Sequence, residues 1–433
     1  MNTELVQSSF LDQEGANTKP SDTTSTFVDN MRLPIHRWFR YSAGFSAQWV
    51  SQVLSNARSP GTLTLLDPFV GSGTTVLAGE ACGVKSAGIE AHPFVARIAT
   101  AKLSWHESIG SFRRLAGDVL DFARRASPDI EDYPRLIRNC YSEASLAQLD
   151  RLKTAWLRCN DHTAVSELTW LALTAILRPT AAAGTAPWQY VLPNKRKKHP
   201  VAPFEALAAQ VAIMSEDMHY FQSVVREHTG AIVQDDARTC SAIQDSTIDL
   251  VLTSPPYANN YDYADATRLE MSFFGEVRGW GDLQTAVRRH LVRSCSQHVS
   301  ADRLDLPTLL VEEGLTPIIE ELSSACRELE KRRLQRRGRK NYHTMVAAYF
   351  SDLARVWTSL RRVCKPGATV CFVVGDSAPY GVHIPVERWL GELALAAGFN
   401  SYRFEKTRDR NVKWNIERKH NIPLREGRLW VEG

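Results

Sequence analysis

Several common signatures are missing from this chain of 433 residues. None of its eight cysteines forms a Cys-x-x-Cys pair, so the sequence indicates neither a zinc site nor a disulfide framework. The longest apolar stretch, around residues 168–177, is too short to cross a bilayer. The N-terminus lacks the basic and apolar regions of a secretory signal. We therefore expect a cytoplasmic protein with no membrane partner and no bound metal.

An excess of one charge sign is also absent. The chain has 52 lysines and arginines against 48 aspartates and glutamates, which gives a formal net charge of only +4. This balance excludes a histone-like tail but permits a local basic groove on a nearly neutral body. Hydrophobic residues make up 44% of the chain, which is enough for a substantial core.

The patterning predicts a tail followed by alternating strands and helices. Residues 1–27 are rich in small polar side chains and predict a disordered tail. A strand at 62–66, a helix at 75–81 and a strand at 86–89 make a β-loop-α-β unit, which predicts a parallel sheet. Further strands are predicted at 231–233, 248–252, 368–377 and 401–406, and further helices at 346–362 and 386–399. The intervening segments 106–230 and 275–343 look mostly helical.

A glycine-rich turn, DPFVGSGTT, occupies residues 67–75 between the first predicted strand and helix. Such a turn places backbone N–H groups at a helix N-terminus, and Gly71 and Gly73 can adopt positive φ and leave room for a ligand. The run contains neither the Gly-x-x-x-x-Gly-Lys-Ser/Thr of a P-loop nor a complete Gly-x-Gly-x-x-Gly dinucleotide fingerprint. These absences disfavour ATP and nicotinamide cofactors.

The same run resembles motif I of the amino-directed DNA methyltransferases. The resemblance implies an α/β fold, a class I S-adenosylmethionine-dependent methyltransferase (Rossmann-like) sheet with helical insertions. It also implies S-adenosylmethionine as the cofactor. Within the motif, the cofactor-binding residues would be Asp67, Pro68, Phe69, Gly71, Ser72, Gly73, Thr74 and Thr75.

Three further residues are assigned to the cofactor by this resemblance. Glu90 ends the second predicted strand, where its carboxylate can accept hydrogen bonds from both ribose hydroxyls. Phe45 belongs to a segment that resembles motif X, although Gly44 replaces the usual basic residue, and it would pack near the methionine part. Asp236 would contact the adenine. Because Asp235 stands where the family has glycine, either aspartate could serve, and we favour Asp236.

The second strong pattern is TSPPY at residues 253–257. Two successive prolines cannot lie inside a central strand or a helix, so they form a stiff edge at the carboxyl end of the strand, where α/β sheets bind ligands. The pattern resembles family motif IV. By this resemblance, the catalytic residues are Ser254, Pro255, Pro256 and Tyr257: the Ser254 hydroxyl and the Pro255 carbonyl accept hydrogen bonds from the target amine, and Tyr257 stacks on a base flipped out of the duplex.

Serine at the first position of this motif goes mainly with cytosine N4, whereas aspartate or asparagine goes mainly with adenine N6. We therefore expect a site-specific methyltransferase that acts on double-stranded DNA in the nucleoid. Three alternatives stay open: an adenine-N6 DNA methyltransferase, a tRNA or rRNA base methyltransferase, and an inactive protein that binds S-adenosylmethionine or DNA. A cognate restriction endonuclease is a candidate partner, and the sequence fixes neither the target site nor the oligomeric state.

The resemblance also divides the chain. The cofactor-binding part is expected at 28–105, the catalytic part at 231–274 and the C-terminal part of the methyltransferase domain at 344–433. The two insertions, 106–230 and 275–343, are expected to recognise DNA. Their basic runs, Lys195–Lys198 and Lys331–Lys340, would neutralise phosphates, which provides affinity and salt dependence but no sequence information.

Overall fold

The computed structural model describes residues 27–41, 44–57, 62–186, 189–197, 199–258, 261–301, 304–409 and 423–433. The predicted disordered tail therefore lies outside the described residues, apart from Phe27, which begins the short 3-10 helix η1 (Phe27–Arg32).

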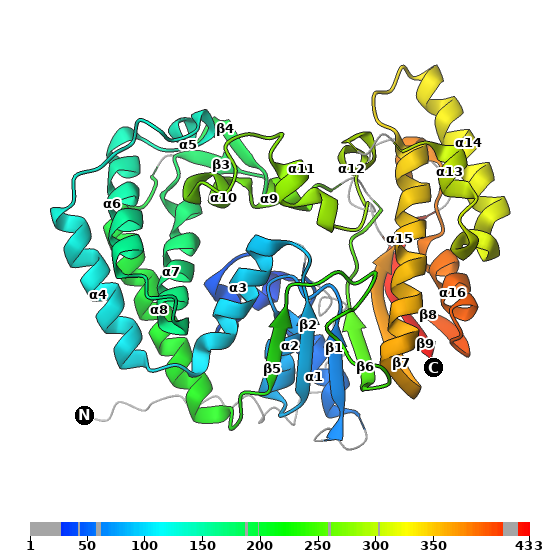
Figure 1. Cartoon of the computed structure of the whole chain (residues 1–433), viewed down its shortest axis with the longest axis horizontal. Coiled ribbons are helices and arrows are strands. Elements are labelled where there is room, and N and C mark those ends of the chain that lie inside the picture. Colours follow the sequence, from blue (N-terminus) through cyan, green and yellow to red (C-terminus); the bar gives the residue numbers. More distant parts are fainter. Residues whose placement is uncertain are drawn as a thin grey trace.

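A seven-stranded sheet forms the centre of the molecule, with the strand order β5-β2-β1-β6-β7-β9-β8 (Figure 1). The first five strands in this order run parallel, and β9 is antiparallel to both of its neighbours. The strands are β1 (Thr64–Asp67), β2 (Lys85–Ile89), β5 (Gly230–Val233), β6 (Ile248–Thr253), β7 (Cys364–Gly375), β8 (Ser401–Asp409) and β9 (Arg425–Glu432). A mixed α/β sheet of this order is that of the class I methyltransferases, so the predicted fold class is confirmed.

Side chains of successive strand residues point to opposite faces of the sheet, and each face is covered by helices. Leu250 and Leu252 of β6 belong to a core with α1 (Ala47–Ser55) and α2 (Thr74–Ala81). Val251, between them, packs in the core formed with α15 (Tyr342–Val363) and α16 (Val386–Ala396). The central strands are thus apolar on both sides, which explains why they read as continuous hydrophobic runs.

The segment between α3 (Pro93–Leu103) and β5 forms a helical lobe beside the sheet, on the left in Figure 1. Its elements are η4 (Ser104–His106), α4 (Ile109–Arg125), α5 (Arg135–Cys140), α6 (Glu143–Cys159), α7 (Ala164–Thr180), the hairpin β3 (Ala183–Thr185) and β4 (Val191–Arg196), and α8 (Pro203–Val224). Ser108, Ser142 and Thr163 cap α4, α6 and α7 by accepting a hydrogen bond from a backbone N–H of the first turn.

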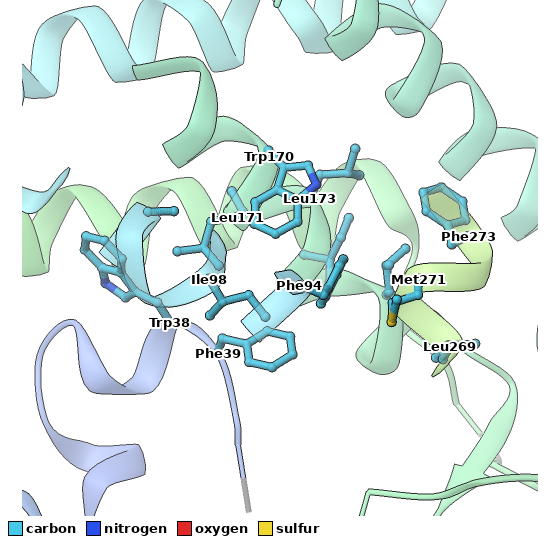
Figure 2. Close-up of a cluster of buried hydrophobic side chains, with 14 of the residues drawn as sticks. Trp38, Phe39, Phe94, Ile98, Trp170, Leu171, Leu173, Leu269, Met271 and Phe273 are labelled. Carbon is cyan, nitrogen blue, oxygen red and sulfur yellow. The ribbon is translucent and has the colours of Figure 1, made fainter. Parts of the chain in front are cut away.

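The lobe shares one core with the rest of the molecule. Phe94 of α3 packs edge-on against Trp170 of α7 at a ring-centroid distance of 5.3 Å (Figure 2). Trp38, from η2 (His36–Trp38), and Phe273 belong to the same buried cluster. Two distant chain segments are therefore held against the lobe by apolar burial.

The second predicted insertion is helical as well. It follows α9 (Tyr263–Ala266) and α10 (Arg268–Phe274), and α14 stands at the upper right of Figure 1. Its elements are α11 (Leu283–Ala286), η5 (Arg288–His290), α12 (Ser296–Ala301), α13 (Leu306–Leu310), η6 (Glu313–Ile318) and α14 (Ile319–Gln335). Within the described ranges, no helix is long and apolar enough to span a membrane.

Loss of the Phe94 ring should destabilise the fold. Phe94 is only 2% exposed, so Phe94→Ala leaves a cavity between α3 and α7 and should lower the free energy of unfolding by about 3–5 kcal/mol. Urea unfolding followed by tryptophan fluorescence measures this loss. The control Leu157→Ala removes a side chain that is 56% exposed and should change stability by less than about 0.5 kcal/mol. Equal stability of the two variants would contradict a shared core.

Candidate functional site

A pocket opens at the carboxyl ends of the central parallel strands, the edge at which α/β sheets bind ligands. Predicted residues from five separate sequence segments meet in its wall. The predicted site residues that line it are Phe45, Pro68, Phe69, Gly71, Ser72, Thr74, Glu90, Asp236, Ser254 and Pro256. The glycine-rich turn and the diproline turn, which are far apart in sequence, therefore border one cavity.

Five predicted residues are not among those that line this pocket. Asp67 and Thr75, the first and last residues of the glycine-rich turn, are completely buried. Gly73, with φ +93°, is the residue that precedes α2. Pro255 is buried, and Tyr257 is half-buried farther along the loop. These residues support or extend the pocket wall.

Asp67 joins the two motifs directly. Its carboxylate accepts a hydrogen bond from Thr75 Oγ1 at 2.5 Å, from Thr253 Oγ1 at 2.5 Å and from the Phe69 backbone N–H at 3.0 Å. Burial raises the pKa of Asp67 to about 6, and the three hydrogen bonds partly oppose this rise. The buried carboxylate thus fixes the end of β6 against the start of α2.

The glycine-rich turn needs glycine at Gly71 for two reasons. Its φ of +54° lies in the left-handed region that side chains with a Cβ rarely adopt. A Cβ there would also approach Tyr41 Cε1 to 3.0 Å. The turn consequently presents bare backbone to the pocket.

Glu90 supplies a buried carboxylate at the pocket wall. It accepts hydrogen bonds from the backbone N–H groups of Gly71 at 2.9 Å and His92 at 2.8 Å. Burial, together with the nearby charge of Asp67, raises its pKa to about 7 despite these bonds. The carboxylate therefore bridges the glycine-rich turn and the segment that follows β2.

The two candidate aspartates after β5 have different surroundings. Asp236 lines the pocket and forms an ion pair with Arg238, with Nη2 2.6 Å from Oδ2. Asp235 instead accepts hydrogen bonds from Ser241 Oγ and the Ala242 N–H, both at 2.9 Å, and is not part of the pocket lining. This placement favours Asp236 over Asp235, and its role stays a prediction.

The Ser254 hydroxyl is oriented by the neighbouring strand. It donates to the Val373 carbonyl of β7 at 3.3 Å, so its oxygen lone pairs remain as acceptors. Farther along the loop, the Tyr257 N–H donates to Tyr263 Oη at 3.4 Å. The Tyr263 ring in turn meets Tyr261 edge-on at 4.6 Å.

Several pocket residues were missed by the sequence analysis. His92 and Tyr263 line the pocket, and so do His290, Leu291 and Val292 of the second insertion. Burial lowers the pKa of His92 to about 3, so its imidazole is neutral, and Nε2 lies 2.8 Å from Thr267 Oγ1. No periodicity or motif in the sequence marks these residues, because only folding brings them to the pocket.

Fold and pocket together define a class I methyltransferase architecture. The chain is similar to proteins named Type II methyltransferase. It is 25% identical over 424 residues to M.BsoBI of Geobacillus stearothermophilus, which covers 89% of this chain and 82% of the relative. It is also 25% identical over 436 residues to M.AvaI of Nostoc sp. and of Anabaena variabilis, which covers 91% of this chain and 85% of each relative. No protein-family model and no solved structure matches the chain.

Burial of Glu90 should make stability depend on pH. Its pKa of about 7 in the folded state lies above the ordinary value of 4.5, so the folded state binds more protons within that window. The contribution of Glu90 to stability should therefore fall, by a few kcal/mol at most, as pH rises from about 4.5 to about 7. Urea unfolding at several pH values measures the free energy of unfolding of the wild type and of Glu90→Gln. The value for the wild type minus that for Glu90→Gln should decrease as pH rises across this window.

The exposed Glu131 provides a matched control for this measurement. Asp67 is present in both the wild type and Glu90→Gln, so its effect on their difference is limited to its interaction with Glu90. The difference in unfolding free energy between the wild type and Glu131→Gln should stay below about 0.5 kcal/mol at every pH, because the Glu131 side chain is exposed. A wild-type advantage over Glu90→Gln that grows with pH would be evidence against the buried carboxylate.

Proposed function

We propose that the chain is a site-specific DNA methyltransferase that transfers a methyl group from S-adenosylmethionine to the exocyclic N4 amine of a flipped cytosine. The observation that carries this proposal is the shared pocket: the glycine-rich turn, Glu90 and Ser254 all line one cavity at the carboxyl edge of a methyltransferase-type sheet. The similarity to two Type II methyltransferases over most of the chain supports it.

The pocket residues fit the cofactor chemically. The glycine-rich turn offers bare backbone, and Glu90 offers a carboxylate for the two ribose hydroxyls. Asp236 and Phe45 line the pocket, where Asp236 would accept a hydrogen bond from the adenine amine and Phe45 would offer an apolar surface to the methionine part. When bound, S-adenosylmethionine supplies an electrophilic methyl group on a sulfonium.

The diproline turn fits the target amine. An exocyclic amine is a weak nucleophile because its lone pair is delocalised into the ring, so acceptors that favour tetrahedral geometry assist attack. The Ser254 hydroxyl donates to the Val373 carbonyl, so its oxygen would be able to accept a hydrogen bond from such an amine. The Pro255 carbonyl would accept the other N–H. As the new N–C bond forms, the bond between the methyl group and the sulfonium would break, and the amine would release one proton to solvent. Tyr257 would stack on the flipped base, which partly offsets the cost of flipping.

Ser254 also favours cytosine over adenine, because the resembled family uses serine at this position mainly for cytosine N4. Adenine N6 is the second candidate, since its amine needs the same two acceptors. An RNA base methyltransferase and an inactive binder are the remaining alternatives. The assay is incubation of mixed-sequence duplex DNA with the chain and S-adenosylmethionine, followed by nucleoside mass spectrometry. N4-methylcytosine supports the proposal, N6-methyladenine corrects the base, and product on tRNA or rRNA alone rejects DNA as the substrate.

Removing the Ser254 hydroxyl should impair methyl transfer without weakening cofactor binding. Loss of one preorganised hydrogen-bonding group typically lowers kcat on the order of 10²-fold. Ser254→Ala should show this loss in a methylation assay, with an unchanged Kd for S-adenosylmethionine by calorimetry. Ser215→Ala, a matched change at a buried hydroxyl on α8, should retain activity. Wild-type kcat for Ser254→Ala would reject the assigned role.

The basic run at the end of α14 is proposed to bind DNA phosphates. Its exposed members are Lys331, Arg336, Arg337, Arg339 and Lys340. Arg332 is instead engaged internally by Glu328 at 2.7 Å and by the Tyr380 carbonyl at 3.3 Å, so it should be left intact.

Glutamine at these five exposed positions should weaken DNA binding and flatten its salt dependence. Each lost phosphate contact lowers the slope of log K against log salt by roughly 0.9. Fluorescence anisotropy at several salt concentrations measures the slope. The matched control replaces five exposed basic residues outside both insertions, which are Lys85, Arg355, Arg403, Lys406 and Arg408. Equal slopes for the two variants would exclude the α14 run from the DNA footprint.

A further inference from the structure

Three metal-ligating side chains from two chain segments meet in the interior close to the catalytic loop. Asp262, Cys295 and His298 each offer one ligand atom, and these atoms lie within 4.8 Å of one another. Asp262 follows the diproline turn and caps α9, while Cys295 immediately precedes α12 and His298 lies within it. All three residues are buried, so the cluster is sealed from bulk water.

The hydrogen bonding of His298 within this cluster is incomplete. Its side chain is 1% exposed, yet neither ring nitrogen has a hydrogen-bond partner among the described residues. Buried polar groups are nearly always paired, because an unmade hydrogen bond costs about 1–3 kcal/mol. A neutral imidazole nitrogen that faces a carboxylate and a thiol is the donor set of a transition-metal site.

Arg288 is the main competitor for this site. Its guanidinium lies 2.7 Å from Asp262 Oδ2 and is held over the Trp280 ring at 4.0 Å. An ion at the cluster must therefore share Asp262 with Arg288, and the Cys295 thiolate would supply the additional negative charge. Carboxylate ligands commonly keep such an outer hydrogen bond, which orients them toward the metal.

We propose that Asp262, Cys295 and His298 bind one divalent transition-metal ion, with Zn²⁺ as the best match. Thiolate and imidazole ligands favour zinc over magnesium or calcium. At zinc bond lengths, a sulfur and a nitrogen ligand lie roughly 3.5 Å apart, which is inside the 4.8 Å limit of the cluster. The ion would tie the segment after the diproline turn to the second insertion and leave a fourth position for water.

The direct test is the metal content and ligand set of the purified full-length wild type. Mass spectrometry for metals should find about one zinc per chain, and zinc X-ray absorption should show one sulfur ligand at about 2.3 Å with lighter ligands completing the shell. Replacement with Co²⁺ should produce a thiolate-to-cobalt charge-transfer band. Absence of stoichiometric zinc together with absence of that band would overturn the proposal and leave a water-filled or dry polar cluster.

Two variants assign the ligands. Cys295→Ser should abolish the thiolate band, and His298→Ala should lower the metal content several-fold, whereas Cys326→Ser changes an equally buried cysteine outside the cluster and should retain one ion. Retention of the band in Cys295→Ser would overturn the assignment. The wild-type measurements hold even if a variant fails to fold. None of these readouts depends on methyl transfer, so the metal site and the proposed function can fail separately.

Discussion

The arrangement of the site depends on one buried carboxylate. Asp67 accepts hydrogen bonds from Thr75 in α2 and Thr253 in β6, and it holds the first residues of the glycine-rich turn through Phe69. A carboxylate taken out of water is costly unless its lone pairs are satisfied, and here three donors from three segments replace the water. Because the same group holds the starts of both loops, the pocket between them has a defined width.

A second type of interaction, the buried arginine–carboxylate ion pair, holds the inserted segments against the rest of the fold. Asp352 of α15 is fully buried and receives both Arg293, at 2.6 Å, and Arg238, at 3.3 Å. Arg178 of α7 likewise contacts Glu270 of α10 at 2.5 Å. Such pairs add little net stability, because desolvation offsets their attraction, but the loss of one partner is expensive. These ion pairs fix the segments that carry Arg238 and Arg293 against α15, and they fix α7 against α10.

Much of the fold could be predicted because its central strands are short apolar runs bounded by glycine, proline or charged residues. β1, β2, β5 and β6 were each located to within about two residues. β9 and the β3–β4 hairpin were not predicted, because antiparallel strands gain stability from partners that the local sequence does not indicate. Tyr263 and His290–Val292 were not predicted for a related reason. They reach the pocket through tertiary packing, and no residue pattern in the sequence indicates that contact.

The sequence by itself determined the chemistry that each loop can offer. DPFVGSGTT requires a turn with positive φ at its glycines, and SPPY requires a stiff break after a strand, since these constraints act within a few residues. Only the tertiary structure decided that the two turns face one pocket and that Asp236, not Asp235, lines it. It also decided that the Ser254 hydroxyl donates to the Val373 carbonyl. Those outcomes depend on strand order and on hydrogen bonds between residues more than 100 positions apart, such as Thr253 with Asp67 and Ser254 with Val373.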